Sequence, residues 1–84
     1  MEDQSKGPTI EQVRALLSEA LQVPEDQISP DLTFGDIPQW DSMGHMEVLM
    51  SLENDYGIEI NPDTITDLVS LPIIFNYLRV NGNV

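Results

Sequence analysis

Apolar residues recur at helical spacing in two long stretches of the chain. The first stretch follows Thr9, and Gln12 stands three residues later, which is typical of the capping box that starts a helix. The second ends before Gly57, a residue type that commonly terminates helices. The spacing predicts helices over about 10–21 and 42–56, whose inward faces hold Ile10, Val13, Leu16, Leu17, Ala20 and Leu21 in the first and Val48, Leu49, Leu52 and Tyr56 in the second.

A short third helix is predicted after residue 61. Asn61 followed by Pro62 favours a helix start, because the first N–H groups of a helix need no intrahelical partner. Ile65 and Leu68 are expected to face inward. The preceding residues 58–60 alternate like a strand, but no second run is available to pair with them, so they are predicted to be an extended connector.

The last predicted helix begins near residue 71. Ser70 is placed to cap it, and Pro72 is tolerated in its first turn. Gly82 is expected to end it. Its apolar face consists of Ile74, Phe75, Tyr77 and Leu78.

Pro24 is expected to close the first helix, and residues 22–41 are rich in turn signals and form a long loop. A loop of this length in a small domain needs anchors. Five apolar residues are expected to dock onto the core from it: Ile28, Leu32, Phe34, Ile37 and Trp40. The predicted fold class is all-α, a small four-helix bundle of three main helices and a short third one, with a long ordered loop between helices 1 and 2. Residues 1–8 are expected to be a flexible tail and 9–84 a single domain.

Charge narrows the choice of partners. The formal net charge is −12, and the three basic residues are Lys6, Arg14 and Arg79. Such a surface repels nucleic acid and anionic membranes and attracts basic protein surfaces. The plainer alternative is that acidity only keeps the protein soluble and monomeric. The sequence has no cysteine, no signal-peptide layout and no apolar run that could span a bilayer, so we expect a cytoplasmic monomer without membrane insertion.

Ser42 is the candidate site of chemistry. It stands at the predicted start of the second helix, where unpaired N–H groups and the helix dipole favour an attached anion. On its own, the Asp41-Ser42 pair is usually just a helix cap. The interpretation of Ser42 as an attachment point for a phosphorylated group therefore depends on the rest of the chain.

The combined pattern resembles the acyl and peptidyl carrier proteins. Their attachment motif matches Trp40-Asp41-Ser42-Met43, and the resemblance extends from the first helix through Gly57-Ile58-Glu59-Ile60 to the last helix. It implies a freestanding, non-catalytic carrier. Its Ser42 accepts 4′-phosphopantetheine from coenzyme A through a phosphopantetheinyl transferase, and acyl groups are carried as thioesters. Asp41 is implied to assist the transferase.

The same helix offers a candidate partner surface. Met43, Met46 and Met50 recur at helical spacing beside the inward face, and Met-rich surfaces adapt to several partners. Glu47 and Glu53 are acidic positions on this helix. The resemblance implies that they meet basic patches on acyl-loading and acyl-processing enzymes. Gly44 is either a tolerated surface glycine or one that keeps the approach to Ser42 open.

Three other interpretations remain. A Ser42–His45 pair could belong to a small serine hydrolase, but the sequence offers no third member, so His45 is expected to be a surface or partner-contact residue. The chain could be an acidic adaptor without a prosthetic group, or a peptidyl carrier. The spacing of Asp31, Asp36 and Asp41 does not match a calcium loop, and no metal is expected. The pathway, whether fatty-acid, polyketide or another specialised acyl metabolism, stays open.

Overall fold

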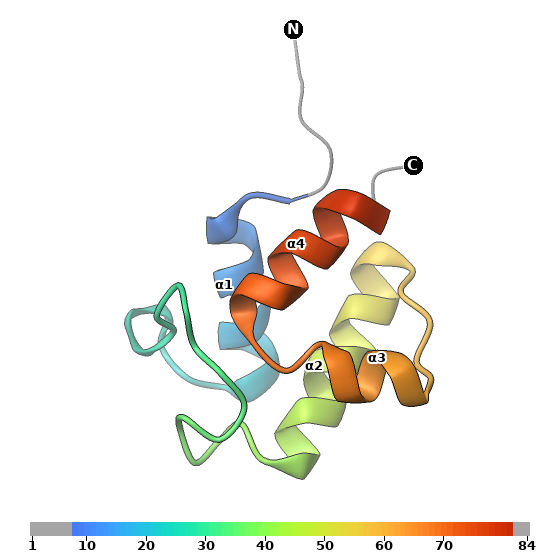
Figure 1. Ribbon diagram of the computed structural model, residues 1–84. Coiled ribbons are helices and arrows are strands. Elements are labelled where there is room, and N and C mark those ends of the chain that lie inside the picture. Colours follow the sequence, from blue (N-terminus) through green and yellow to red (C-terminus); the bar gives the residue numbers. More distant parts are fainter. Residues whose placement is uncertain (1–7, 82–84) are drawn as a thin grey trace, which may run out of the picture.

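The computed structural model describes residues 8–81 as a bundle of helices (Figure 1). It contains α1 (Ile10–Leu21), the 3₁₀ turn η1 (Glu25–Gln27), α2 (Ser42–Tyr56), α3 (Pro62–Asp67) and α4 (Leu71–Asn81). The described residues form no strand, so the all-α prediction is confirmed. The expected helix stop at Gly82 lies outside the described residues. So does the expected tail, except for Pro8, which is buried.

Three of the four helices begin at predicted caps. The Thr9 hydroxyl accepts a hydrogen bond from the Gln12 N–H at 3.2 Å, and the Gln12 side chain accepts one from the Thr9 N–H at 2.9 Å. Asn61 and Thr64 make the equivalent reciprocal pair at α3, with both bonds at 2.9 Å. The Ser70 hydroxyl accepts a hydrogen bond from the N–H of Ile73 at the start of α4. These bonds satisfy backbone donors that a helix leaves unpaired.

The core lies between α1, α2 and α4, and α3 packs against α2 (Figure 1). Side chains from all four helices and from the long loop meet in one cluster. Burial of each large aliphatic side chain contributes roughly 1.5–3 kcal/mol. The fully buried members are Val13, Leu17, Ile28, Trp40, Val48, Leu49, Leu52, Leu68, Leu71, Ile74 and Leu78.

The loop between α1 and α2 is ordered because α1 holds its first half. The guanidinium of Arg14 donates two hydrogen bonds of 2.7 Å, from Nε to the Ile28 carbonyl and from Nη2 to the Glu25 carbonyl. Ile28 is itself fully buried. The charged group of Arg14 thus binds backbone carbonyls of the loop, and these bonds hold η1 against α1.

The second half of the loop is tied to the connection between α3 and α4. The Phe34 N–H donates to the Val69 carbonyl and the Leu71 N–H donates to the Leu32 carbonyl, both at 2.8 Å. Leu32 and Trp40 are buried as predicted, and Ile37 packs partly buried against the core. The expectation that the Phe34 side chain docks onto the core is wrong: it is 39% exposed.

Candidate functional site

Ser42 is the first residue of α2, and its side chain is exposed. Asp41 precedes it in extended conformation, and its Oδ1 accepts a hydrogen bond of 2.9 Å from the Gly44 N–H. The Asp41 carbonyl accepts a second bond, of 2.7 Å, from the His45 N–H. Asp41 therefore fixes the helix start, and the serine hydroxyl is presented where the helix dipole favours negative charge.

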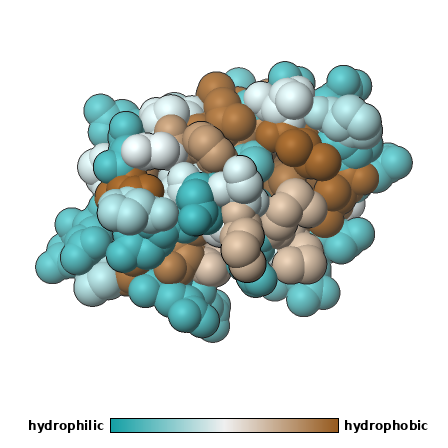
Figure 2. Space-filling view, turned by 90° about the horizontal axis from the view of Figure 1, so that it is seen from below, coloured by the Kyte–Doolittle hydropathy of each residue, from teal (hydrophilic) through white to brown (hydrophobic). Residues whose placement is uncertain are grey.

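The outer face of α2, as we call Met43, Met46, Glu47, Met50 and Glu53, is open to solvent. Met43 is 80% exposed, Met46 38% and Met50 44%, and both glutamates are exposed. The view from the end of the molecule at which α2 begins shows apolar side chains grouped among hydrophilic ones (Figure 2). Exposed apolar groups of this kind are typical of interaction surfaces.

Gly44 is present because the loop passes very close to α2. A Cβ atom at this position would lie 2.1 Å from the Gln39 carbonyl oxygen and 2.9 Å from a methyl group of Leu21. The first contact is with backbone, which cannot turn aside as a side chain can. Gly44 is therefore neither a tolerated surface glycine nor simply a gap for partners: it allows the loop to pack on the first turn of α2.

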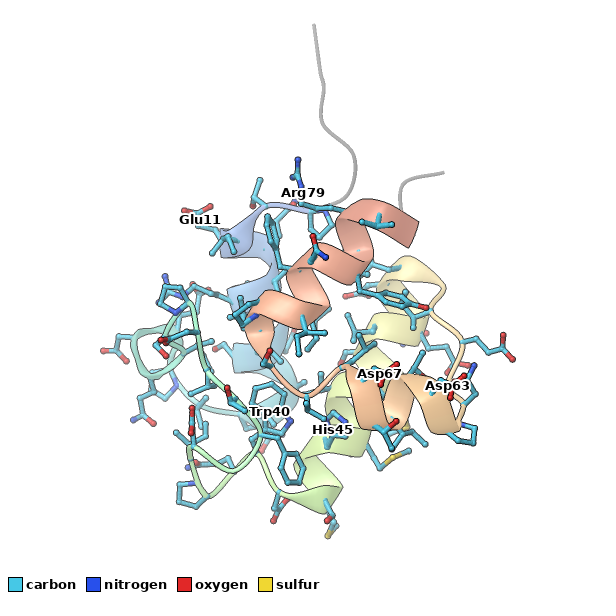
Figure 3. The ribbon with its side chains drawn as sticks, viewed as in Figure 1. Glu11, Trp40, His45, Asp63, Asp67 and Arg79 are labelled. Atoms are coloured by element: carbon cyan, nitrogen blue, oxygen red, sulfur yellow. The ribbon has the colours of Figure 1, made fainter. Side chains whose placement is uncertain are left out.

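His45 is buried, with 5% of its surface exposed, so the expectation of a surface or partner-contact histidine is wrong. The Trp40 indole Nε1–H donates to His45 Nδ1 at 3.1 Å, and His45 Nε2 lies 2.8 Å from the Ile65 carbonyl oxygen. The indole can only donate and the carbonyl can only accept. His45 is therefore the neutral tautomer with its proton on Nε2, and it joins the loop, α2 and α3 (Figure 3).

This arrangement leaves His45 unable to activate Ser42. Nδ1 is occupied as an acceptor and Nε2 as a donor, so neither nitrogen is available to take a proton from the serine hydroxyl. The geometry argues against the Ser–His hydrolase. Trp40 and His45 lie five residues apart, on either side of the start of α2. This closeness in sequence is the only hint of their contact, because a hydrogen bond between a loop and a helix leaves no periodic pattern.

An apolar pocket of about 340 Å³ adjoins Ser42 and is open to solvent. Three segments form its wall: the loop, the first turns of α2, and α3 with the residues that follow it. The Phe34 ring meets the His45 ring edge to face, with 5.4 Å between ring centroids and an angle of 85°. The residues that line this Ser42 pocket are Phe34, Ser42, His45, Met46, Ile65 and Val69.

The described residues show neither a metal cluster nor a membrane-spanning helix. Among residues 8–81, no three His, Cys, Asp or Glu side chains are grouped so that they could hold a metal ion. In the same part of the chain, no helix has both the length and the apolar character needed to cross a bilayer.

Comparison with known proteins identifies the class to which this fold and site belong. The family model described as "Phosphopantetheine attachment site" matches residues 11–74, a range that holds nearly all of α1, the whole of α2 and α3, the start of α4 and the residues that line the Ser42 pocket. An acyl carrier protein of Thermosynechococcus vestitus is 25% identical over 75 residues, which cover 89% of this chain and 93% of that protein. An acyl carrier protein of Thermobifida fusca is 24% identical over 75 residues, covering 89% of this chain and 95% of that protein.

The chain therefore belongs to the acyl carrier protein family, whose cofactor is phosphopantetheine. The residues at the start of α2 fit such a group. An exposed hydroxyl stands in the first helical turn, where backbone N–H groups lack intrahelical acceptors and a phosphate is favoured. Beside it lies an apolar pocket into which an acyl group could be placed.

Proposed function

We propose that this protein is an acyl carrier whose Ser42 holds 4′-phosphopantetheine through a phosphodiester bond. The observation that carries the proposal is the exposed Ser42 hydroxyl at the first residue of α2, beside the apolar Ser42 pocket, in a chain that matches the family over residues 11–74. The bound group supplies a thiol on which acyl groups are carried as thioesters. The sequence itself contains no cysteine.

In this proposal the protein's own residues present and hold the attachment point. Asp41 caps the first turn of α2 through the Gly44 N–H, which holds the backbone that presents Ser42 to solvent. The carboxylate beside the serine also supports the proposed role of Asp41 in recognition by the phosphopantetheinyl transferase. A buried, doubly bonded His45 keeps the neighbouring wall in place without reacting with the hydroxyl.

We also propose that partner enzymes dock on the outer face of α2. Exposed methionines can adapt to differently shaped partners, and Glu47 and Glu53 attract basic docking patches. The formal net charge of −12 strengthens this attraction at long range and disfavours self-association, which supports a monomer. Fast association and ready release suit a carrier that must visit several enzymes in turn.

Within the family we favour an acyl carrier over a peptidyl one, and a location in the cytoplasm. The acidic outer face and the apolar Ser42 pocket both support an acyl cargo. Trp40 before Asp41-Ser42, together with His45 three residues after the serine, resembles the pattern of carriers outside housekeeping fatty-acid synthesis. We therefore place the protein in a polyketide, lipid or other specialised acyl pathway ahead of housekeeping fatty-acid synthesis.

Intact mass tests the attachment. The protein incubated with coenzyme A and a broad-specificity phosphopantetheinyl transferase should gain the mass of one phosphopantetheinyl group. Ser42→Ala should abolish the gain, and Ser51→Ala, a matched change on the same helix, should retain it. A wild-type chain that never gains this mass would leave the acidic adaptor as the better explanation, and a gain retained by Ser42→Ala would move the attachment elsewhere.

Charge reversal tests the docking surface. Glu47→Lys combined with Glu53→Lys should slow transfer by the phosphopantetheinyl transferase about tenfold at low salt, with a smaller effect at high salt. Glu11→Lys combined with Glu19→Lys changes the net charge equally on the exposed side of α1 and should have a much smaller effect. Equal rates for the two double variants would show that recognition depends on total charge and not on the outer face of α2.

A further inference from the structure

The Ser42 pocket ends at the His45 ring. His45 is one of the six residues that line the pocket, yet it is 5% exposed, so one part of its ring faces the pocket and the rest is covered. Behind it stands Trp40, which is fully buried and does not line the pocket. The two rings lie 6.1 Å apart between centroids (Figure 3). His45 therefore separates the pocket from Trp40.

The His45 ring is held in this position from two sides. Trp40 bonds to Nδ1 from the loop, and the Ile65 carbonyl accepts from Nε2 on α3. Rotation of the ring would break both bonds and leave a buried indole N–H and a backbone carbonyl without partners, which is strongly unfavourable. The ring is thus a fixed wall and not a side chain that moves aside readily for an incoming apolar group.

The apolar core of the protein is not open to this pocket. Leu49, Leu68 and Leu71 are fully buried and none of them lines the Ser42 pocket. An acyl chain that extended from the pocket toward Trp40 would have to pass the position of the His45 ring. The space that remains is the solvent-open pocket of about 340 Å³, at the small end of the range for small-molecule sites.

We propose that His45, held by Trp40 and the Ile65 carbonyl, sets the depth of the Ser42 pocket and limits the sheltered cargo to a short acyl group. His45 is then a specificity-determining residue: longer chains leave their distal carbons in water or on a partner enzyme. This inference rests on the proposed function, because the cargo reaches the pocket from Ser42.

Thermal unfolding of a loaded series tests the proposal. A broad-specificity phosphopantetheinyl transferase would attach acetyl, butyryl, hexanoyl, octanoyl and decanoyl phosphopantetheine from the corresponding coenzyme A thioesters, with intact mass verifying each product. Sheltered carbons stabilise the folded state, so Tm should rise with chain length while the pocket fills. We expect the wild-type Tm to rise over the shorter chains and to level off before decanoyl.

Two substitutions at position 45 distinguish the effect of the side chain's volume from the effect of its hydrogen bonds. His45→Ala removes the wall, and its Tm should keep rising through decanoyl. His45→Leu loses the same two hydrogen bonds but fills the space, and its Tm should level off as in the wild type. Both His45 variants leave the indole N–H of Trp40 without an acceptor. Each is therefore also made in a Trp40→Phe background, where that N–H is absent. Ser51→Ala, a change on α2 at a position that does not line the pocket, should keep the wild-type plateau.

Each other result would overturn the inference. A wild-type Tm that climbs steadily through decanoyl shows that His45 does not limit depth. If the Tm of His45→Ala levels off at the same chain length as that of His45→Leu, with Trp40 and with Trp40→Phe alike, His45 does not limit depth either. If mass confirms loading but no chain changes Tm, the pocket shelters no cargo, although the proposed function stands. If the protein gains no phosphopantetheinyl mass, the proposed function and this inference fail together.

Discussion

The two halves of α2 are held to the protein in different ways. The first half, residues 42–46, is fixed by directional contacts: the Asp41 cap, the close approach of Gln39 to Gly44, and the two hydrogen bonds of His45. The second half is fixed by apolar packing, with Val48, Leu49 and Leu52 fully buried. Gly57, at a φ of 72°, then ends the helix.

The difference shows how an exposed site can be held rigidly. A residue that must present its side chain to other enzymes cannot be buried, so Ser42 itself contributes little to the core. Its neighbours provide the order instead, through contacts whose direction matters and which leave the surface open. The second half has no such requirement and relies on burial, which is strong but not directional.

The largest expected effect comes from the packed half. Leu52→Ala removes a fully buried side chain that packs in the core, and it should lower the free energy of unfolding by about 2–5 kcal/mol. Chemical denaturation of the unmodified protein measures this change. Met50→Ala, on the outer face of the same helix, should alter stability by less than about 0.5 kcal/mol. Similar losses for both variants would contradict the assignment of this half to the core.

An intermediate effect is expected in the first half. Gly44→Ala places a Cβ atom against the Gln39 carbonyl and should force the loop away from α2. The strain is about 1–3 kcal/mol and the gain in helix propensity about 1 kcal/mol, so we expect a net loss of up to about 2 kcal/mol. Denaturant titration measures the loss, and the transfer rate at Ser42 should fall with it. A stabilised alanine variant would show that the loop does not pack here.

The smallest effect concerns Tyr56 at the end of the second half. Burial, and secondarily the carboxylate of Asp55, raise the pKa of the Tyr56 hydroxyl above 10.0. Folding then favours the protonated phenol, so its contribution to stability is complete below pH 10.0 and is lost as the pH rises through the raised value. The unfolding free energy of the wild type should therefore fall more steeply above pH 10.0 than that of Tyr56→Phe. Parallel curves for the two proteins would contradict this.

The helices could be predicted from the sequence because their signals are local. Helical spacing and the Thr9 and Asn61 caps predicted where α1 and α3 begin, and Gly57 predicted where α2 ends. The 3₁₀ turn η1 was not predicted. It depends on Arg14, a residue eleven positions before Glu25, whose hydrogen bonds to the loop no local pattern reveals.

Some features of the candidate site could likewise be predicted from the sequence, and others could not. The position of Ser42 at the start of α2 and the exposure of Met43, Met46 and Met50 were predicted from helical spacing. The burial of His45 and the necessity of Gly44 were not, because both depend on where the loop crosses the helix. Ser42 as the attachment point and the outer face as the docking surface stay predictions until the experiments above are made.

The position of Trp40 gives the protein an intrinsic fluorescent probe. It is the only tryptophan in the sequence, and its indole contacts the His45 ring behind the Ser42 pocket. Intrinsic tryptophan fluorescence therefore reports on this single junction of loop, α2 and α3, without any background from other indoles. A change in emission on loading or on partner binding would locate the event at that junction, and no label would have to be attached to an exposed surface that partners use.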